Sequence, residues 1–231
     1  MVDEHELAGI SGLSAAWLLS KTCDVALYEE EARLGGHSDT VDWDGVSVDN
    51  GFIVYNELNY PDLTAMFAHL GVATHESCMG FSLSLDGGRL EWCGETYRSV
   101  FAQKRNIASP SFLWMLREIF RFNRICTEDR DNGVLGHASI GEYLAMRKFS
   151  HAFRDDYLIP MAAAIWSCPM ATMLAFPMGS FARFFHNHGL LTVTDRPQWH
   201  TVRGGSGEYV RRIRDRLPDV RADEPVLSLH R

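Results

Sequence analysis

The feature that most constrains the fold is an apolar run that ends in an acid and is followed by an arginine and a glycine pair. Residues 25–28 read Val-Ala-Leu-Tyr, Glu29 follows directly, and Arg33, Gly35 and Gly36 come next. A continuous apolar run is typical of a parallel strand buried on both faces. A carboxylate at its end accepts hydrogen bonds from ribose hydroxyls in dinucleotide-binding folds, and glycines let the backbone approach a bulky anion. This order predicts a flavin dinucleotide site; a strand followed by a charged surface turn is the alternative.

A partial glycine motif precedes this strand. Gly9 and Gly12 fit the second and third glycines of the G-x-G-x-x-G turn that opens a helix in dinucleotide-binding domains. Leu7 stands where the first glycine is expected, and residues 1–6 are too acidic and too few for a buried first strand. Gly9 lies twenty residues before Glu29, which is the separation expected between the turn and the ribose acid. We expect the helix that starts near Gly9 to contact the pyrophosphate with its free N–H groups.

Length, charge and cysteine content limit the classes of protein to which this chain can belong. The chain has 231 residues, of which 46% are hydrophobic, so it is large enough for one large domain or two small ones. Its net charge of −8 argues against a general binder of nucleic acids or anionic membranes. Five scattered cysteines without a C-x-x-C motif, and an acidic amino end without a signal peptide, favour a reduced, cytoplasmic location. No apolar run is long enough to span a bilayer.

Periodicity, capping residues and turn residues predict the order of the elements. Hairpins are expected around Asp44-Gly45 and around Asp86-Gly87-Gly88, and a final strand is expected at residues 225–229. Another strand is expected at residues 24–28. The expected helices lie at residues 10–20, 61–70, 110–123, 151–166, 177–188 and 207–217. One more is expected to open with the capping box Ser139-Ile140-Gly141-Glu142.

This order predicts an α/β fold with two domains. Residues 1–71 and 201–231 are expected to form an incomplete Rossmann-like FAD-binding domain, because a doubly wound chain returns to its first sheet after an insertion. Residues 72–200 are expected to form an inserted α+β domain on the substrate side, with the Phe81–Trp92 hairpin and several helices.

Several motifs together resemble a known family. They are Gly9-Ile10-Ser11-Gly12-Leu13, Glu29, Arg33-Leu34-Gly35-Gly36-His37, Asp49-Asn50-Gly51-Phe52, Tyr157-Leu158-Ile159-Pro160-Met161 with Ala164-Ile165-Trp166, and Arg203-Gly204-Gly205-Ser206. With them the chain resembles FAD-dependent oxidoreductases of the flavin amine oxidase superfamily, in the bacterial branch of NAD/FAD-binding, amine-oxidase-like proteins. It lacks the family's apolar first strand, first glycine and carboxyl-terminal part. We therefore expect a chain truncated at both ends that binds FAD weakly.

The resemblance implies a flavoprotein enzyme that transfers a hydride from an unknown small organic substrate to FAD. It implies no particular catalytic residue. The cofactor contacts it implies are Gly9 and Gly12 at the pyrophosphate, Glu29 at the ribose, Arg33, Gly35, Gly36 and His37 along the phosphates and ribityl chain, Gly51 and Phe52 beside the isoalloxazine, and Val226 at the adenine. Two alternatives stay open: a truncated non-catalytic fragment of such an enzyme, and an NAD(P)-dependent dehydrogenase.

Other features have two readings each. His186 and His188 could bind a metal, but alternate helix residues face different sides, so we expect a surface pair and no metal site. Residues 166–168 could face a substrate pocket, although an aromatic residue at a helix end is more often part of a core. Residues 112–122 are apolar on more than one helix face, which fits a core helix or one that contacts lipid or admits an apolar, lipid-like substrate.

Overall fold

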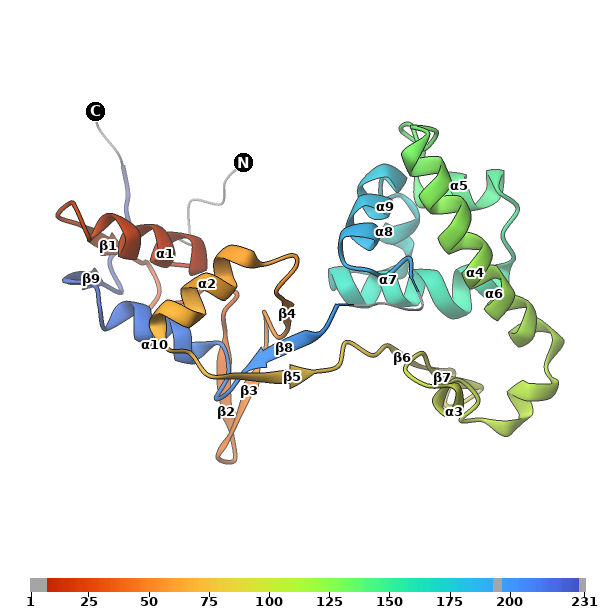
Figure 1. Ribbon diagram of the computed structural model, residues 1–231, viewed down its shortest axis with the longest axis horizontal. Coiled ribbons are helices and arrows are strands. Elements are labelled where there is room, and N and C mark those ends of the chain that lie inside the picture. The colour runs from red at the N-terminus through yellow and green to blue at the C-terminus, as the bar shows by residue number, and fades with distance from the viewer. Residues whose placement is uncertain (1–7, 193–196, 229–231) are drawn as a thin grey trace. The chain divides into compact units, whose positions relative to one another are not determined.

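The computed structural model describes residues 8–192 and 197–228, and the chain divides into two compact units (Figure 1). The first unit joins the segments Met1–Cys78 and Gln198–Arg231, and the second is the segment Met79–Pro197. Each unit has its own cluster of buried hydrophobic residues, and neither cluster draws a residue from the other unit. The fold is a mixture of helices and strands.

The first unit contains a parallel strand pair. Strand β1 (Ala26–Tyr28) pairs in parallel with β9 (Asp219–Arg221), and Leu27 lies opposite Val220. Helices α1 (Ile10–Leu19), α2 (Pro61–Leu70) and α10 (Gly207–Arg214) accompany this pair, with α10 in contact with both α1 and α2. The chain thus returns to its first sheet after a long insertion, as the doubly wound topology predicts.

The position of the returning strand differs from the prediction. We expected it at residues 225–229, but residues 225–228 form no strand, and residue 229 lies outside the described part of the chain. The returning strand is β9, six residues earlier. Residues 225–228 lack a neighbouring strand among the described residues, and an apolar run without a partner for its backbone groups does not become a strand.

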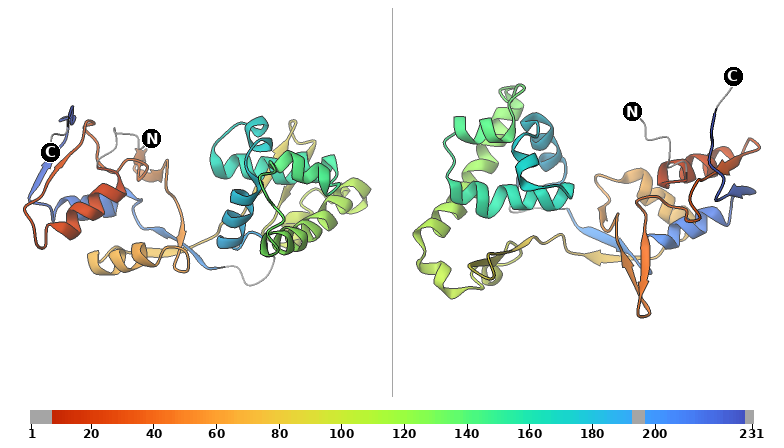
Figure 2. Two further views of the ribbon diagram at one scale, coloured as in Figure 1. Left: turned by 90° about the horizontal axis from the view of Figure 1, so that it is seen from above. Right: turned by 180° about the vertical axis from the view of Figure 1, so that it is seen from behind.

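Two antiparallel sheets complete the first unit. The predicted hairpin is confirmed: β2 (Thr40–Trp43) pairs with β3 (Val46–Asp49), and it projects from the unit (Figure 2). A second sheet, in the order β4-β8-β5, was not predicted; it consists of β4 (Tyr55–Asn56), β8 (Trp199–Val202) and β5 (Thr74–Ser77). Because β5 pairs with β8, residues 74–77 belong to the first unit and not to the insertion where we expected them.

The second unit begins with a hairpin and continues in helices (Figure 1). Strands β6 (Ser82–Leu85) and β7 (Leu90–Cys93) form a sheet of their own, so this hairpin lies outside the dinucleotide sheet as expected. The helical elements are α3 (Tyr97–Val100), the 3-10 helix η1 (Lys104–Ala108), α4 (Pro110–Asp131), α5 (Ile140–Met146), α6 (His151–Phe153), the π-helical turn η2 (Arg154–Leu158), α7 (Ile159–Trp166), α8 (Met170–Leu174) and α9 (Met178–Asn187).

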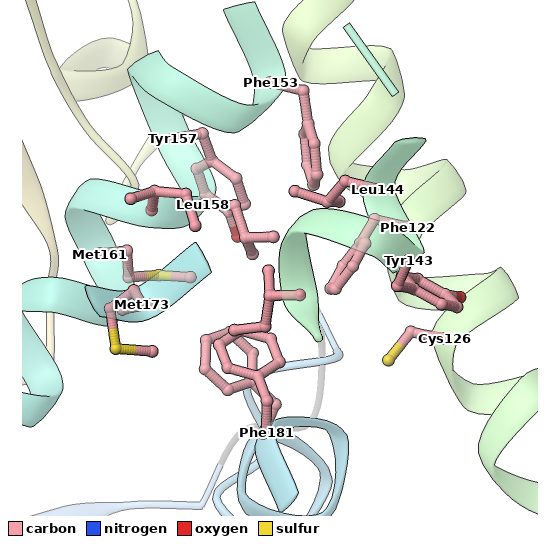
Figure 3. Packing of buried hydrophobic residues seen from close by; sticks show 14 of the residues in the cluster. Phe122, Cys126, Tyr143, Leu144, Phe153, Tyr157, Leu158, Met161, Met173 and Phe181 are labelled. Carbon is pink, nitrogen blue, oxygen red and sulfur yellow. The ribbon is translucent and has the colours of Figure 1, made fainter. Parts of the chain in front are cut away.

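Aromatic rings fill the core of the second unit. Phe122 on α4 packs against Phe153 on α6 and Phe181 on α9, with ring centroids 5.3 and 6.4 Å apart (Figure 3). Ring pairs at such separations add packing energy beyond the area that they bury. Among the described residues, no helix combines the length and the apolar character that crossing a bilayer requires.

Candidate functional site

The amino end of α1 lies beside the glycine pair that follows β1. Gly9 is the N-cap of α1, and no side chain caps this end of the helix. Gly9 forms a parallel bridge with Gly35, whose N–H donates to the carbonyl of Ala8 at 2.8 Å. The first N–H groups of a helix have no partner within the helix. The amino end of α1 therefore offers backbone donors and the positive end of a helix dipole to an anion.

Glu29 lies at the same point. It follows β1 directly and is only 5% exposed. Its Oε2 accepts a hydrogen bond from the Ala8 N–H at 2.8 Å, and its Oε1 accepts one from the Glu31 N–H at 3.1 Å. Its backbone carbonyl accepts from the N–H of Glu224, just after β9. A carboxylate has about four lone-pair directions, so these two side-chain bonds leave acceptor capacity for ribose hydroxyls.

The glycine pair has a structural reason of its own. Gly35 and Gly36 both have left-handed backbones, with φ of 112° and 53°. A Cβ on Gly35 would lie 2.8 Å from the Ser38 carbonyl oxygen and 3.0 Å from Cγ2 of Val210 on α10. We expected these glycines to make room for an anionic group. The close packing of this loop, within itself and against α10, also requires glycine at position 35.

Arg33 is held at the rim of a small cavity. Its guanidinium donates to the Gly36 carbonyl at 3.0 Å and forms an ion pair with Asp39 at 3.4 Å. The cavity has a volume of about 270 Å³, and its lining includes Arg33, Ser38, Arg211 and Arg214. Arg211 and Arg214 also form ion pairs, with Glu208 and Asp215, so each arginine that lines this cavity already has an acidic partner.

His37, Gly51 and Phe52 come together across a chain crossing. The Phe52 N–H donates to the His37 carbonyl at 2.9 Å. A Cβ on Gly51 would lie only 2.1 Å from that carbonyl oxygen, so only glycine fits where the two segments cross. The Phe52 ring contacts Tyr60 edge to face at 5.8 Å, and burial raises the pKa of Tyr60. The fold therefore brings His37 next to Gly51 and Phe52, which lie about fourteen residues later in the sequence.

A polar network near these residues was not predicted. Asp49 Oδ1 accepts hydrogen bonds from Thr40 Oγ1 at 2.5 Å, from the Ser206 N–H at 2.7 Å and from Ser206 Oγ at 2.8 Å. Thr40 Oγ1 in turn accepts from the Gly207 N–H at 2.7 Å. This network ties the β2–β3 hairpin to the loop before α10. Asp49 and Ser206 belong to the quoted motifs, but their contact spans 157 residues and no local pattern indicated it.

The remaining predicted positions are placed as follows. Gly12 lies in the first turn of α1. Val226 is not on a strand, which corrects our expectation; it is 38% exposed and follows Glu224 by two residues. Leu7, at the expected first glycine position, lies outside the described residues.

Other candidate positions serve in packing contacts. Trp166 packs within 6.4 Å of Phe176, Phe181, Phe184 and Phe185, inside the second unit. His188 stacks on Phe184 at 3.9 Å, and its Nδ1 lies 2.9 Å from the Phe184 carbonyl. In the described part of the chain, no three His, Cys, Asp or Glu side chains are grouped so that they could hold a metal ion.

Comparison with known proteins identifies relatives of the fold. Residues 8–70 match the family model of the NAD(P)-binding Rossmann-like domain. A structure of putrescine oxidase bound to putrescine is 22% identical to this chain with a TM-score of 0.65, over 95% of this chain and 50% of that chain. An oxidoreductase from Methanosarcina mazei gives 13% identity and a TM-score of 0.59 over 94% of this chain and 50% of the other.

A proposed protoporphyrinogen oxidase from Exiguobacterium sp. 255-15 gives 19% identity and a TM-score of 0.55, over 97% of this chain and 52% of that chain. No curated protein matches. At these identities the likeness shows the fold. The chain spans about half the length of the structures that it matches.

Proposed function

We propose that this chain forms the FAD-binding part of an FAD-dependent oxidoreductase of the amine-oxidase type. One observation carries the proposal: the uncapped amino end of α1, the buried carboxylate of Glu29 and the Gly35 loop meet at one point through the amide and carbonyl of Ala8. A dinucleotide needs donors for its pyrophosphate and an acceptor for its ribose within a few ångströms of each other. The residues present fit both needs.

The roles of the other residues follow from this placement. The N–H groups at the start of α1, between Gly9 and Gly12, would bind the pyrophosphate. Arg33 and the Gly35-Gly36 turn would neutralise and accommodate the phosphates, with His37 leading toward Gly51 and Phe52 beside the flavin ring. Val226, close in sequence to the amide that donates to the Glu29 carbonyl, would contact the adenine.

When bound, FAD would accept a hydride from a C–H or C–N bond of a small organic substrate. The residues of this chain would orient the cofactor and exclude water from it. Catalysis by a flavin requires placement and electrostatics more than acid–base groups, so the proposal assigns no catalytic residue to the described chain.

A nicotinamide cofactor is the alternative that the Rossmann-like match keeps open. The Glu29 carboxylate suits the ribose of NAD as well as that of FAD, and it would repel the extra phosphate of NADP. Arg33, Gly35 and Gly36, which follow the ribose acid, favour FAD by the family resemblance.

Titration of FAD and of NAD into purified protein tests the assignment. Glu29→Ala removes a charge-assisted hydrogen-bond acceptor, which is worth about 1.5–3 kcal/mol, so FAD affinity should fall about ten- to a hundredfold. Glu31→Ala is the matched control, because its side chain is exposed. The visible flavin absorption bands and quenching of flavin fluorescence report binding.

Three outcomes separate the hypotheses. Equal FAD affinities in the Glu29→Ala variant and the parent, with both folded by circular dichroism, would contradict the role of Glu29. Preferential binding of NAD would favour the dehydrogenase. Binding of neither cofactor by folded protein would favour the non-catalytic fragment.

A further inference from the structure

Helix α4 carries large apolar side chains on its outer face. Its buried face includes Phe112, Met115 and Phe122, which pack in the core of the second unit. On the opposite face Leu113, Trp114 and Phe120 are 44%, 51% and 60% exposed. Positions three, four and seven apart share one side of a helix. These three side chains, together with Arg117 and Arg124, therefore form one stripe, which we call the α4 outer face.

The two arginines of this face have no acidic partner. Arg117 and Arg124 are exposed and form no ion pair with any described residue, and the Arg117 guanidinium lies 5.0 Å from the centre of the Trp114 ring. Arg121, four residues after Arg117 on the same side of the helix, differs because it has partners: its guanidinium pairs with Glu118 at 3.7 Å and lies over the Phe149 ring. The α4 outer face therefore presents unpaired positive charge next to apolar surface.

The segment that contains the α4 outer face also carries an excess of basic residues. The whole chain has a net charge of −8, yet residues 97–127 contain six basic residues and one acid, Glu118. Glu118 is buried and accepts hydrogen bonds from Ser150, so it adds no negative charge to the outer face. Lys104 and Arg105, just before the helix, are exposed, and Arg105 donates only to the carbonyls of Gly88 and Arg89 among the described residues.

We propose that the α4 outer face docks this protein on the surface of an anionic lipid bilayer. A helix that lies in a membrane interface combines bulky apolar residues, a tryptophan and unpaired basic residues. Long arginine side chains reach the phosphates while their stems stay among apolar groups. The acids Glu128 and Asp131 follow on α4 and limit the docking face to residues 113–124 of the helix.

Another exposed apolar surface lacks this charge pattern. On the β2–β3 hairpin Trp43 is 76% exposed and pairs across the strands with Val46. Its sequence neighbours are Asp42 and Asp44, whose charge an anionic surface repels. The hairpin therefore supplies a matched control: an exposed tryptophan of the same chain in an acidic setting.

Sedimentation with lipid vesicles tests the proposal on the full chain without added cofactor. We expect binding to vesicles that contain phosphatidylglycerol, little binding to pure phosphatidylcholine, and release as salt is raised. A basic residue near an anionic surface contributes about 1 kcal/mol, so Arg117→Gln and Arg124→Gln should each weaken partitioning about fivefold. Trp114→Ala should weaken partitioning at least as much. Two controls should leave it unchanged: Trp43→Ala, and Arg154→Gln, because Arg154 is already paired with Asp155.

A spectroscopic readout locates the contact. Lipids with brominated chains should quench tryptophan fluorescence in the parent protein, and Trp114→Phe should remove most of that quenching. Equal binding to both vesicle types, no binding, or equal losses for Trp43→Ala and Trp114→Ala would overturn the proposal. So would a dimer that Trp114→Ala dissociates, because the face would then be a contact between copies of this chain. Circular dichroism confirms that each variant is folded.

Discussion

At the scale of single residues, the site depends on positions where a side chain would collide with the backbone. Gly51 is the sharpest case, since a Cβ there would lie 2.1 Å from the carbonyl oxygen of His37. Gly35 is similar, because its backbone is left-handed and its loop packs against Val210. Both glycines are expected to lie beside the cofactor. They also allow the protein's own segments to meet, which places the backbones of His37 and Phe52 together.

Gly51→Ala should destabilise the first unit, because the loop must move to accommodate the methyl group. We expect a loss in unfolding free energy of about 1–3 kcal/mol, which is typical of overpacking. Gly179→Ala is the control: it lies in the first turn of α9, where an added Cβ meets nothing closer than 3.8 Å, and alanine favours a helix by up to about 1 kcal/mol. Urea denaturation measures both, and a smaller loss for Gly51→Ala than for Gly179→Ala would contradict the close crossing.

At the scale of elements, buried polar groups join α4 to α5. Asp129 on α4 accepts a hydrogen bond from the Tyr143 hydroxyl at 2.8 Å and also binds Arg147. Cys126 lies one turn before Asp129 and is fully buried. Burial, with the nearby Asp129 carboxylate, raises the pKa of Cys126 to about 12, and burial also raises the pKa of Tyr143. Both side chains therefore remain neutral in the folded protein well above their ordinary titration range.

This contact predicts a loss of stability in alkaline solution. The unfolded chain loses the Cys126 proton near its ordinary pKa of 9, whereas the folded chain keeps it to about pH 12. Stability from this group is present below pH 9 and falls as the pH rises above it, by up to about 1.4 kcal/mol per pH unit. Cys126→Ala should make the unfolding free energy fall less steeply between pH 9 and 10.5. An unchanged slope would contradict the assignment.

Under native conditions at pH 8, iodoacetamide should label the exposed Cys23 and Cys78 but not the buried Cys126.

Elements with local signals were predictable from the sequence. Helix α2 begins at Pro61 and ends before Gly71, whose φ of 67° matches its expected role past the end of the helix. The Asp44-Gly45 hairpin and the Ser139–Glu142 capping box also formed as expected. Strands β4, β5 and β8 were missed because they are two to four residues long and are defined by partners far away in the sequence. The misplaced returning strand has the same cause, since apolar residues become a strand only beside a partner.

The candidate site was also predictable only where its residues follow a pattern along the chain. Gly9, Glu29 and Gly35 could be grouped because the size of a dinucleotide sets their spacing along the chain. Asp49, Thr40 and Ser206 could not, because their hydrogen bonds join segments more than 150 residues apart. Each of these residues on its own looks like part of an ordinary turn. Their network indicates that the loop before α10 is fixed by the hairpin and not by local preference.

At the scale of the whole molecule, the fold places two separate cores in one chain. The buried cluster of the first unit brings together residues from both of its segments, such as Leu27 and Ile213. The cluster of the second unit lies wholly between Leu90 and Leu191. A continuous segment with its own core is the usual definition of an independently folding domain. The first unit, in contrast, needs both ends of the described chain for its β1–β9 pair.

This asymmetry predicts that residues 79–197 fold on their own, while residues 1–78 do not. The isolated second unit should show a helical circular dichroism spectrum and a cooperative thermal transition, because its aromatic core loses no member. Residues 1–78 alone lack β9, β8 and α10, so Leu27 and Phe67 lose the partners that cover them, and we expect no cooperative transition. The matched test is a fusion of residues 1–78 to 198–231 through a short glycine-serine linker, which should restore cooperativity. If residues 1–78 alone melt as sharply as the fusion, the returning segment is not part of the first core and the doubly wound description fails.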